Sequence, residues 1–141
     1  KNLSKMSRGE IRSQLAKCNE SIKAITGKDN MLFRPPSGAY NNDVVDAASS
    51  LGMYTIQWSL DSLDYEGLSE KQIFDRIVPK VKNGDIILFH NDIKNTPKAL
   101  DQILHALKDK GFEFVSAYDL IYKENYTIDY SGMQKQVQNI H

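Results

Sequence analysis

The chain has 141 residues, which is enough for one domain with a buried core. Its 18 basic and 18 acidic residues cancel, which argues against a protein specialised for nucleic acid or for anionic membrane surfaces. The single cysteine, Cys18, excludes an intramolecular disulfide and a cysteine-rich zinc site. No apolar run is long enough to span a bilayer. Because the chain begins at Lys1 and not at a methionine, we expect a fragment or a processed product.

The first predicted element is a long amphipathic helix. Ser7 and Glu10 have the spacing of a capping box, in which side chains satisfy the free amides of the first turn. Gly27 can close this helix. Its apolar stripe follows at steps of three and four residues, at Ile11, Leu15, Cys18, Ile22 and Ile25.

Short segments rich in apolar, aromatic or β-branched residues predict strands, and each is followed by a predicted helix. The predicted strands span residues 31–33, 54–58, 85–90 and 112–115. Helices are predicted from a cap at Asn41 or Asn42, from a cap at Ser69, from Thr96, and over residues 117–122. The helix that begins at Thr96 has its apolar stripe at Leu100, Ile103, Leu104 and Leu107.

This alternation of strand, loop and helix favours parallel βαβ units and an α/β fold. In such folds, functional side chains collect in the loops after the carboxyl ends of the strands. Arg34 follows one predicted strand, residues 58–64 follow the next, and His90 ends the third. We therefore expect these groups to meet on one rim. The final segment is polar and unpatterned, so we divide the chain into a domain portion, 1–122, and a polar tail, 123–141.

His90 is the strongest single candidate for a functional side chain, because it ends an apolar strand beside Asn91 and Asp92. The alternative is a histidine that caps the strand by bonding to the backbone. Arg34 stands before two prolines, where a rigid strand exit would let it bind a carboxylate through two hydrogen bonds. A surface ion pair is the alternative for that residue.

Asp61 and Asp64 form a third candidate, because a carboxylate beside a histidine stabilises the charged ring. A solvated acidic loop is the alternative. Trp58 is the only tryptophan, and it either fills the core or lines a sugar or acyl pocket. Structural or surface roles are expected for His105, His141 and Cys18.

These candidates lie in segments that together resemble motifs of the polysaccharide deacetylases of carbohydrate esterase family four. Residues 34–38, Arg-Pro-Pro-Ser-Gly, resemble the third motif of that family. Residues 58–65 resemble the fourth motif, and residues 87–90, Ile-Leu-Phe-His, resemble the fifth. The segments occur in the family's order, and the elements after them resemble its usual ending. The resemblance covers residues 1–122.

The resemblance implies an N-deacetylase acting on N-acetylated cell-wall polysaccharide, peptidoglycan or chitin-like. The implied fold is a partial (β/α) barrel with parallel strands, whose N-terminal strands are missing from this chain. In the family, a divalent metal, usually zinc, binds an Asp and two His of the first two motifs, and a second Asp is the base. This chain has no Asp-Asp pair and no His-x-x-x-His, so we expect no metal to bind to it alone. Residues 1–4 resemble the family's sequence just after the second of those histidines.

Carried over residue by residue, the resemblance implies a division of labour at the site. His90 would be the general acid that protonates the leaving amine, and Asp64 would hold the His90 ring in its useful tautomer. Arg34 would orient the catalytic Asp of the missing segment. Fixed donors and a positioned acid are what amide hydrolysis requires, because the oxyanion must be stabilised and amines leave poorly unless protonated.

The same resemblance implies an oxyanion site and a substrate pocket. The backbone amide of Ser37 would stabilise the oxyanion, and Trp58 and Leu88 would enclose the acetyl methyl group. The remaining residues of the implied pocket are Pro36, Tyr65 and Asp61. Ser37 and Tyr65 stand where the family often has Tyr and Trp, which would change the groove wall.

Two functional hypotheses from different classes stay open. One is an enzyme whose N-terminal segment is cleaved, omitted or supplied by a complementing fragment or a swapped homodimer. The other is a non-catalytic carbohydrate-binding or interaction module that retains the groove. A third, a metallohydrolase with His90 and Asp92 as ligands, falls short of the three protein ligands of a catalytic zinc site. The expected partner is an acetylated glycan, the expected location is the bacterial cell wall or exterior, and the chain alone is expected to be inactive.

Overall fold

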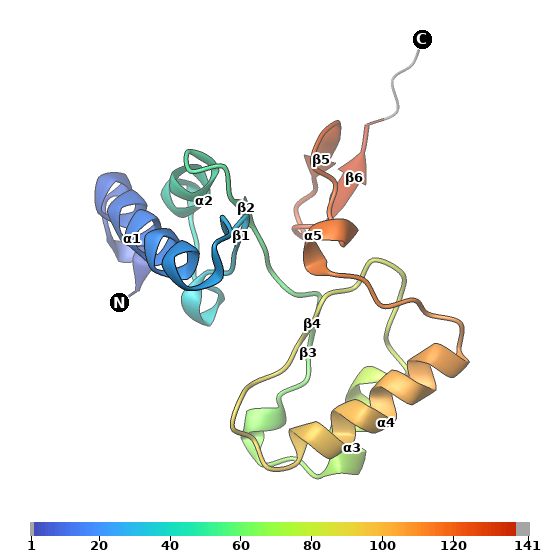
Figure 1. Cartoon of the computed structure of the whole chain (residues 1–141). Coiled ribbons are helices and arrows are strands. Elements are labelled where there is room, and N and C mark those ends of the chain that lie inside the picture. Colours follow the sequence, from blue (N-terminus) through green and yellow to red (C-terminus); the bar gives the residue numbers. More distant parts are fainter. Residues whose placement is uncertain (1, 138–141) are drawn as a thin grey trace. The chain divides into compact units, whose positions relative to one another are not determined.

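The computed structural model describes residues 2–137 (Figure 1), so Lys1 and His141 lie outside the described range. The chain forms two compact units, which meet in the sequence between Gln57 and Trp58. Each unit contains a pair of parallel strands and its own buried core. Within residues 2–137, no helix is both long and apolar enough to cross a membrane. The helices and the two parallel strand pairs confirm the predicted α/β class with parallel strands.

The first unit packs two helices beside a short parallel strand pair (Figure 1). Its elements are η1 (Leu3–Lys5), α1 (Arg8–Thr26), β1 (Leu32–Phe33), η2 (Pro36–Gly38), α2 (Asn42–Ser49) and β2 (Tyr54–Thr55). In the strand pair, Leu32 lies opposite Tyr54 and Phe33 lies opposite Thr55. The buried core of this unit comprises Leu3, Ile11, Leu15, Val44, Ala47, Ala48 and Met53.

The predicted apolar stripe of α1 is only partly buried. Ile11 and Leu15 are buried against α2, as expected. The expectation is wrong for Cys18, which is exposed, and for Ile25, whose side chain is 87% exposed. For Cys18 the reason is the position of the covered face, because the neighbouring Asn19 contacts the core residue Met53, with 3.4 Å between the Asn19 amide nitrogen and Met53 Sδ. For Ile25 the reason is length, since α2 has 8 residues and α1 has 19. The carboxyl-terminal turns of α1 therefore extend beyond the helix that covers its amino-terminal half.

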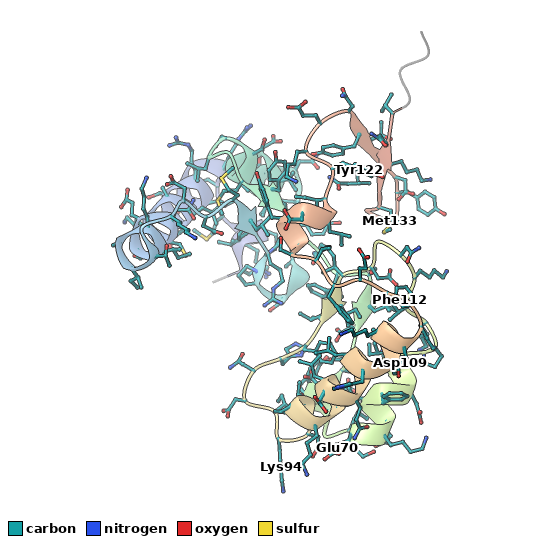
Figure 2. The ribbon with its side chains drawn as sticks, turned by 45° about the vertical axis from the view of Figure 1, so that its right-hand side comes forward. Glu70, Lys94, Asp109, Phe112, Tyr122 and Met133 are labelled. Atoms are coloured by element: carbon teal, nitrogen blue, oxygen red, sulfur yellow. The ribbon has the colours of Figure 1, made fainter. Side chains whose placement is uncertain are left out.

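The second unit packs two helices against another parallel strand pair. Its elements are β3 (Leu60–Asp61), η3 (Asp64–Glu66), α3 (Glu70–Ile77), β4 (Ile87–Leu88), α4 (Thr96–Asp109), α5 (Ala117–Leu120), β5 (Tyr126–Ile128) and β6 (Gln134–Gln136). Leu60 lies opposite Ile87, and Asp61 lies opposite Leu88. The buried core comprises Ile73, Ile77, Val78, Ala99, Ile103 and Leu107. Phe112, just beyond the end of α4, packs against this core (Figure 2).

The predicted helix caps are present in both units. Ser7 and Ser69 each form a complete capping box with the residue three positions later. The side chain of Asn41 accepts a hydrogen bond from the Val44 amide at 3.1 Å and so caps α2. Gly27 closes α1 in the left-handed conformation, with φ of 70°. Local sequence thus sets where these helices begin and end.

The predicted strand at residues 112–115 is not formed. Its backbone finds no neighbouring strand among the described residues, and Phe114 and Val115 are more than half exposed. A β-prone segment becomes a strand only when a partner accepts its hydrogen bonds. These two residues line an apolar cavity of about 270 Å³ with residues of β4 and α4. On α4, Leu104 is 40% exposed and Ala99 is buried, which corrects the predicted stripe.

The segment expected to be a polar tail contains an antiparallel hairpin, β5 paired with β6. Asp129 holds its turn, because the carboxylate accepts the amides of Ser131 and Met133 and pairs with Lys135 at 3.0 Å. Hydrogen bonds from Ser131, and the contact with Lys135, hold the pKa of Asp129 well below its usual range. The hairpin is not predicted from the sequence, because its strands carry no apolar alternation.

Candidate active site

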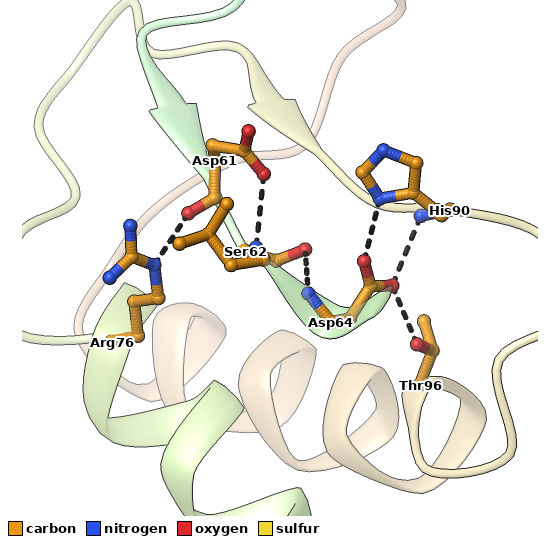
Figure 3. A network of polar contacts seen from close by, with 7 residues as sticks. Asp61, Ser62, Asp64, Arg76, His90 and Thr96 are labelled. Carbon is orange, nitrogen blue, oxygen red and sulfur yellow. Dashed lines mark hydrogen bonds and ion pairs between the residues drawn. The ribbon is translucent and has the colours of Figure 1, made fainter. Parts of the chain in front are cut away.

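Two side chains singled out from the sequence meet at the carboxyl ends of β3 and β4 (Figure 3). These strands are parallel neighbours, so the residues after them emerge at the same edge. Asp64 begins the single turn η3 after β3, and His90 comes shortly after β4. Leu63 takes a left-handed conformation, with φ of 51°, and its amide is held by the Asp61 carboxylate at 3.0 Å. That sharp turn brings Asp64 back toward β4.

The Asp64 carboxylate is fully buried and binds donors through both oxygens. Oδ1 lies 2.7 Å from Nδ1 of His90. Oδ2 accepts the His90 backbone amide at 3.0 Å and the Thr96 hydroxyl at 2.6 Å. Because an ionised carboxylate only accepts hydrogen bonds, Nδ1 carries the shared proton. The other ring nitrogen, Nε2, is then left without a partner among residues 2–137, and the His90 side chain is 35% exposed.

The electrostatics of the pair favour an ionised Asp64. Burial by itself raises the pKa of this carboxyl group. Hydrogen bonds from Thr96, from the backbone and ring of His90, and from Ser62 outweigh burial and lower the pKa from 3.8 to about 2. Asp64 is therefore a fixed negative charge at neutral pH, and it faces a partly exposed imidazole.

Neighbouring residues hold this arrangement from outside. Ser62 is fully buried, with its amide donating to the Leu88 carbonyl at 3.1 Å and its hydroxyl accepting the Asp64 amide at 3.4 Å. Nε of Arg76, on α3, donates to the Asp61 carbonyl at 2.9 Å. The Tyr65 ring meets the His90 ring edge to face, with centroids 4.7 Å apart. The loop after β3 is thus tied to both β4 and α3.

The remaining predicted site residues divide between the two units. Trp58 and Leu88 belong to the second unit, where Trp58 is partly buried and Leu88 is buried on β4. Arg34, Pro36 and Ser37 belong to the first unit, where Arg34 follows β1 and both Pro36 and Ser37 lie within η2. The structure brings Asp64 and His90 together, with Tyr65 against the ring, and assigns the arginine loop to the other unit.

The loop at the carboxyl end of β1 has an unusual backbone. Ser37 takes a left-handed conformation, with φ of 56°, and Gly38 follows with φ of 66°. The amides of Gly38 and Ala39 bond back to Pro35 and Pro36, which closes a tight turn. The Ser37 amide makes no hydrogen bond within the described range. It is a free donor, which is the local chemistry that an oxyanion site needs.

Thr96 was predicted from the sequence only as the start of a helix, so its part in the site was missed. Its hydroxyl is a direct partner of Asp64, and the residue is 7% exposed. The signal available in the sequence was a hydroxyl residue at the helix start after the His90 loop. That signal could not reveal which acceptor the hydroxyl would find.

The described residues do not fit a catalytic metal site. Within residues 2–137, no group of three or more His, Cys, Asp or Glu side chains could hold a metal ion. Nδ1 of His90 faces Asp64, and the adjacent Asp92 is exposed in a left-handed turn with φ of 61°. A zinc enzyme built on this pair of residues would lack its third protein ligand.

Comparisons with known proteins address the family. Residues 1–56 match the family model for polysaccharide deacetylase. The chain is 31% identical over 119 residues to the peptidoglycan-N-acetylmuramic acid deacetylase PdaA of Bacillus subtilis, a match covering 82% of this chain and 45% of that protein. It is 33% identical over 118 residues to the peptidoglycan-N-acetylglucosamine deacetylase PgdA of Listeria monocytogenes, covering 84% of this chain and 25% of that protein. The chain is thus similar to the polysaccharide deacetylase family, by the family model over residues 1–56 and by named peptidoglycan deacetylases over more than 80% of its own length.

Solved structures of this family share the fold of the chain. A pseudoenzyme of carbohydrate esterase family four from Bacillus anthracis matches with a TM-score of 0.81 and 33% identity, over 85% of this chain and 42% of that one. A peptidoglycan N-acetylglucosamine deacetylase, Bc1960, matches with a TM-score of 0.80 and 29% identity, over 85% of this chain and 58% of that one. The chain spans less than half the length of the curated relatives named above.

Proposed function

We propose that this chain supplies the acid side of the active site of a hydrolytic N-deacetylase that acts on peptidoglycan or a related chitin-like glycan. The observation that carries the proposal is the Asp64 to His90 pair, with a contact of 2.7 Å between a buried carboxylate and a partly exposed ring. A module that only binds sugar has no need of such a pair. The relatives named as peptidoglycan deacetylases support the substrate class.

The proposed chemistry of His90 is a proton transfer to the leaving nitrogen. Hydrolysis of the N-acetyl group forms a carbon–oxygen bond to the acetyl carbon and breaks the carbon–nitrogen bond. The sugar amine leaves poorly unless its nitrogen gains a proton as that bond breaks. Asp64 binds Nδ1, so the proton donor is Nε2 of protonated His90. The products are acetate and a free amino sugar, and the proton lost from His90 is later replaced from solvent.

The other roles rest on family motifs and on local chemistry. Arg34 orients the catalytic Asp of the complete domain, and the free amide of Ser37 stabilises the oxyanion. Trp58, Leu88, Tyr65 and Asp61, all in the second unit, are proposed to contact the acetyl group and the sugar, and the role of Pro36 rests on the family motif alone. The divalent metal of the family, zinc by family expectation, has no ligand set among residues 2–137, so no step is assigned to it. We place the protein at the bacterial cell wall, because the relatives' names specify peptidoglycan.

The proposed complete fold is a (β/α) barrel, of which this chain forms a part. Two separate parallel strand pairs leave strand edges to be covered. Phe114 and Val115 are exposed beside an apolar cavity, and the segment 112–115 has β-prone residues without a ladder. We propose that a further segment of the deacetylase domain covers the exposed side of residues 112–115. This segment would belong to the same protein, to a complementing fragment or to a second copy.

The test is acetate release by the complete protein that contains this chain. On peptidoglycan or N-acetylglucosamine oligomers, His90→Ala should remove most turnover while metal content stays at the wild-type level. Loss of metal in that variant would make His90 a ligand and would contradict its role as the acid. The isolated chain should release no acetate, and release by it would contradict the division of the site.

The second candidate function is a non-catalytic module. The observation that favours it is the likeness to the Bacillus anthracis protein, which is a pseudoenzyme. In that case the complete protein would bind N-acetylglucosamine oligomers without releasing acetate. Binding would also survive His90→Ala, which separates this candidate from the enzyme.

A further inference from the structure

We propose that Thr96 is a positioning residue, whose hydroxyl locks the Asp64 carboxylate in the orientation that presents Oδ1 to the His90 ring. The inference deepens the proposed function and rests on His90 acting as the acid. Thr96 is the first residue of α4 and is almost completely buried. Its Oγ1 donates to Asp64 Oδ2 at 2.6 Å, across 32 positions of sequence (Figure 3).

The geometry shows why a third donor matters. A carboxylate can turn about the bond that joins it to Cβ, because that torsion is broad. One hydrogen bond from the His90 ring to Oδ1 would not stop this turning. At Oδ2, the His90 amide and the Thr96 hydroxyl donate from two different elements, the exit of β4 and the start of α4. Together they restrain Oδ2 and leave Oδ1 facing Nδ1.

The Thr96 hydroxyl does not cap a backbone amide of α4, the helix that Thr96 begins. A threonine at a helix start commonly caps free amides with its side chain. In α4 the cap residue is Asn95, which makes no side-chain cap and instead donates to the Leu68 carbonyl at 2.8 Å. Thr96 directs its hydroxyl to Asp64. The start of α4 therefore lacks a side-chain cap, and the Thr96 hydroxyl binds the Asp64 carboxylate instead.

The orientation of the ring depends on this support. Catalytic groups work only when they are held close to their productive geometry, and a displacement of about 1 Å can cost roughly 100-fold in rate. Without the Thr96 hydroxyl, the carboxylate keeps the His90 amide at Oδ2 and gains freedom to turn. The consequence is a ring that is held less firmly, while substrate contacts and metal content are untouched.

The test compares Thr96→Val, which removes the hydroxyl at nearly constant shape, with Thr96→Ser, which keeps it. On the 141-residue chain, NMR follows the His90 Nδ1 proton and the titration of the Asp64 carboxyl carbon. We expect T96V to broaden or abolish the ring proton signal and to raise the pKa of Asp64. T96S should keep the wild-type ring signal and the wild-type pKa of Asp64. Thr96→Ala serves as a second variant without the hydroxyl if valine disturbs folding. A wild-type ring signal in both hydroxyl-free variants overturns the proposal.

Turnover of the complete protein separates this inference from the function on which it rests. We expect T96V to lower kcat by roughly 10-fold to 100-fold, with KM and metal content near the wild-type values, and T96S to restore kcat. Wild-type turnover in His90→Ala would overturn the proposed function itself. An inactive His90→Ala variant combined with wild-type kcat in T96V would overturn the role of Thr96 alone.

Discussion

Replacement of Asp64 by asparagine should reverse the tautomer of His90. The carboxylate accepts hydrogen bonds from the Thr96 hydroxyl and from the ring and the backbone amide of His90, and that amide cannot change its direction. In Asp64→Asn, the side-chain oxygen must therefore remain at the Oδ2 position, which places the new NH₂ group against Nδ1 of His90. A donor there requires Nδ1 to accept, so the ring proton moves to Nε2.

Asp64→Asn should lower both the free energy of unfolding and the turnover of the complete protein. A hydrogen bond to a charged group contributes about 1.5–3 kcal/mol, so loss of the ionised Asp64 should lower the free energy of unfolding by roughly that amount. In the complete protein, a ring fixed as the neutral Nε2–H tautomer cannot act as a strong acid. We expect turnover to fall by about 10²–10⁴-fold, the usual contribution of a positioned acid or base.

The assay for the tautomer is a long-range ¹H–¹⁵N NMR spectrum of His90, together with urea unfolding. Asp61→Asn is the matched control, because among residues 2–137 the Asp61 carboxylate accepts only the Leu63 amide, and an asparagine oxygen can accept the same bond. The control should keep the wild-type ring spectrum and lose less than about 0.5 kcal/mol. An unchanged Nδ1–H tautomer in Asp64→Asn would refute the assigned hydrogen-bond directions.

Three further predictions concern stability. Because the pKa of Asp64 is lowered from 3.8 to about 2 by folding, its contribution of roughly 2 kcal/mol is complete above pH 3.8 and is lost as pH falls through 2. The urea midpoint of the wild type should fall over this pH range, and the midpoint of Asp64→Asn should lack this fall. An equal fall in both proteins would contradict the prediction. Thr96→Val should lower the free energy of unfolding by about 1–3 kcal/mol, because it removes a hydrogen bond to the buried Asp64. Thr55→Val removes a buried hydroxyl that has no partner among residues 2–137, so it should leave the free energy of unfolding unchanged or raise it in the same urea titration. On α4, Leu107→Ala should cost about 2–5 kcal/mol and Leu104→Ala much less, because Leu107 is 1% exposed and Leu104 is 40% exposed; similar costs would show that the two are equally buried.

Some features of this protein were determined by the sequence alone. Helix caps at Ser7, Asn41 and Ser69 depend on residues three positions apart, and the structure contains them as predicted. The alternation of strands and helices predicted parallel pairing, which both parallel strand pairs confirm, although the strand predicted over 54–58 forms only at Tyr54–Thr55 and β3 lies in the segment predicted as a loop. Parallel neighbours place their carboxyl ends together, which is why Asp64 and His90 could be expected to meet. The roles of these residues in catalysis stay predictions.

Other features were decided only by the tertiary structure, because they depend on which element covers which. Ile25 continues an apolar stripe yet is exposed, since α2 is too short to reach it. The 112–115 segment has strand composition but no described partner, so no ladder forms. Thr96 finds its acceptor 32 positions away, beyond the reach of any local pattern. Periodicity and capping act within a few residues, whereas burial and long-range hydrogen bonds depend on how the folded elements pack.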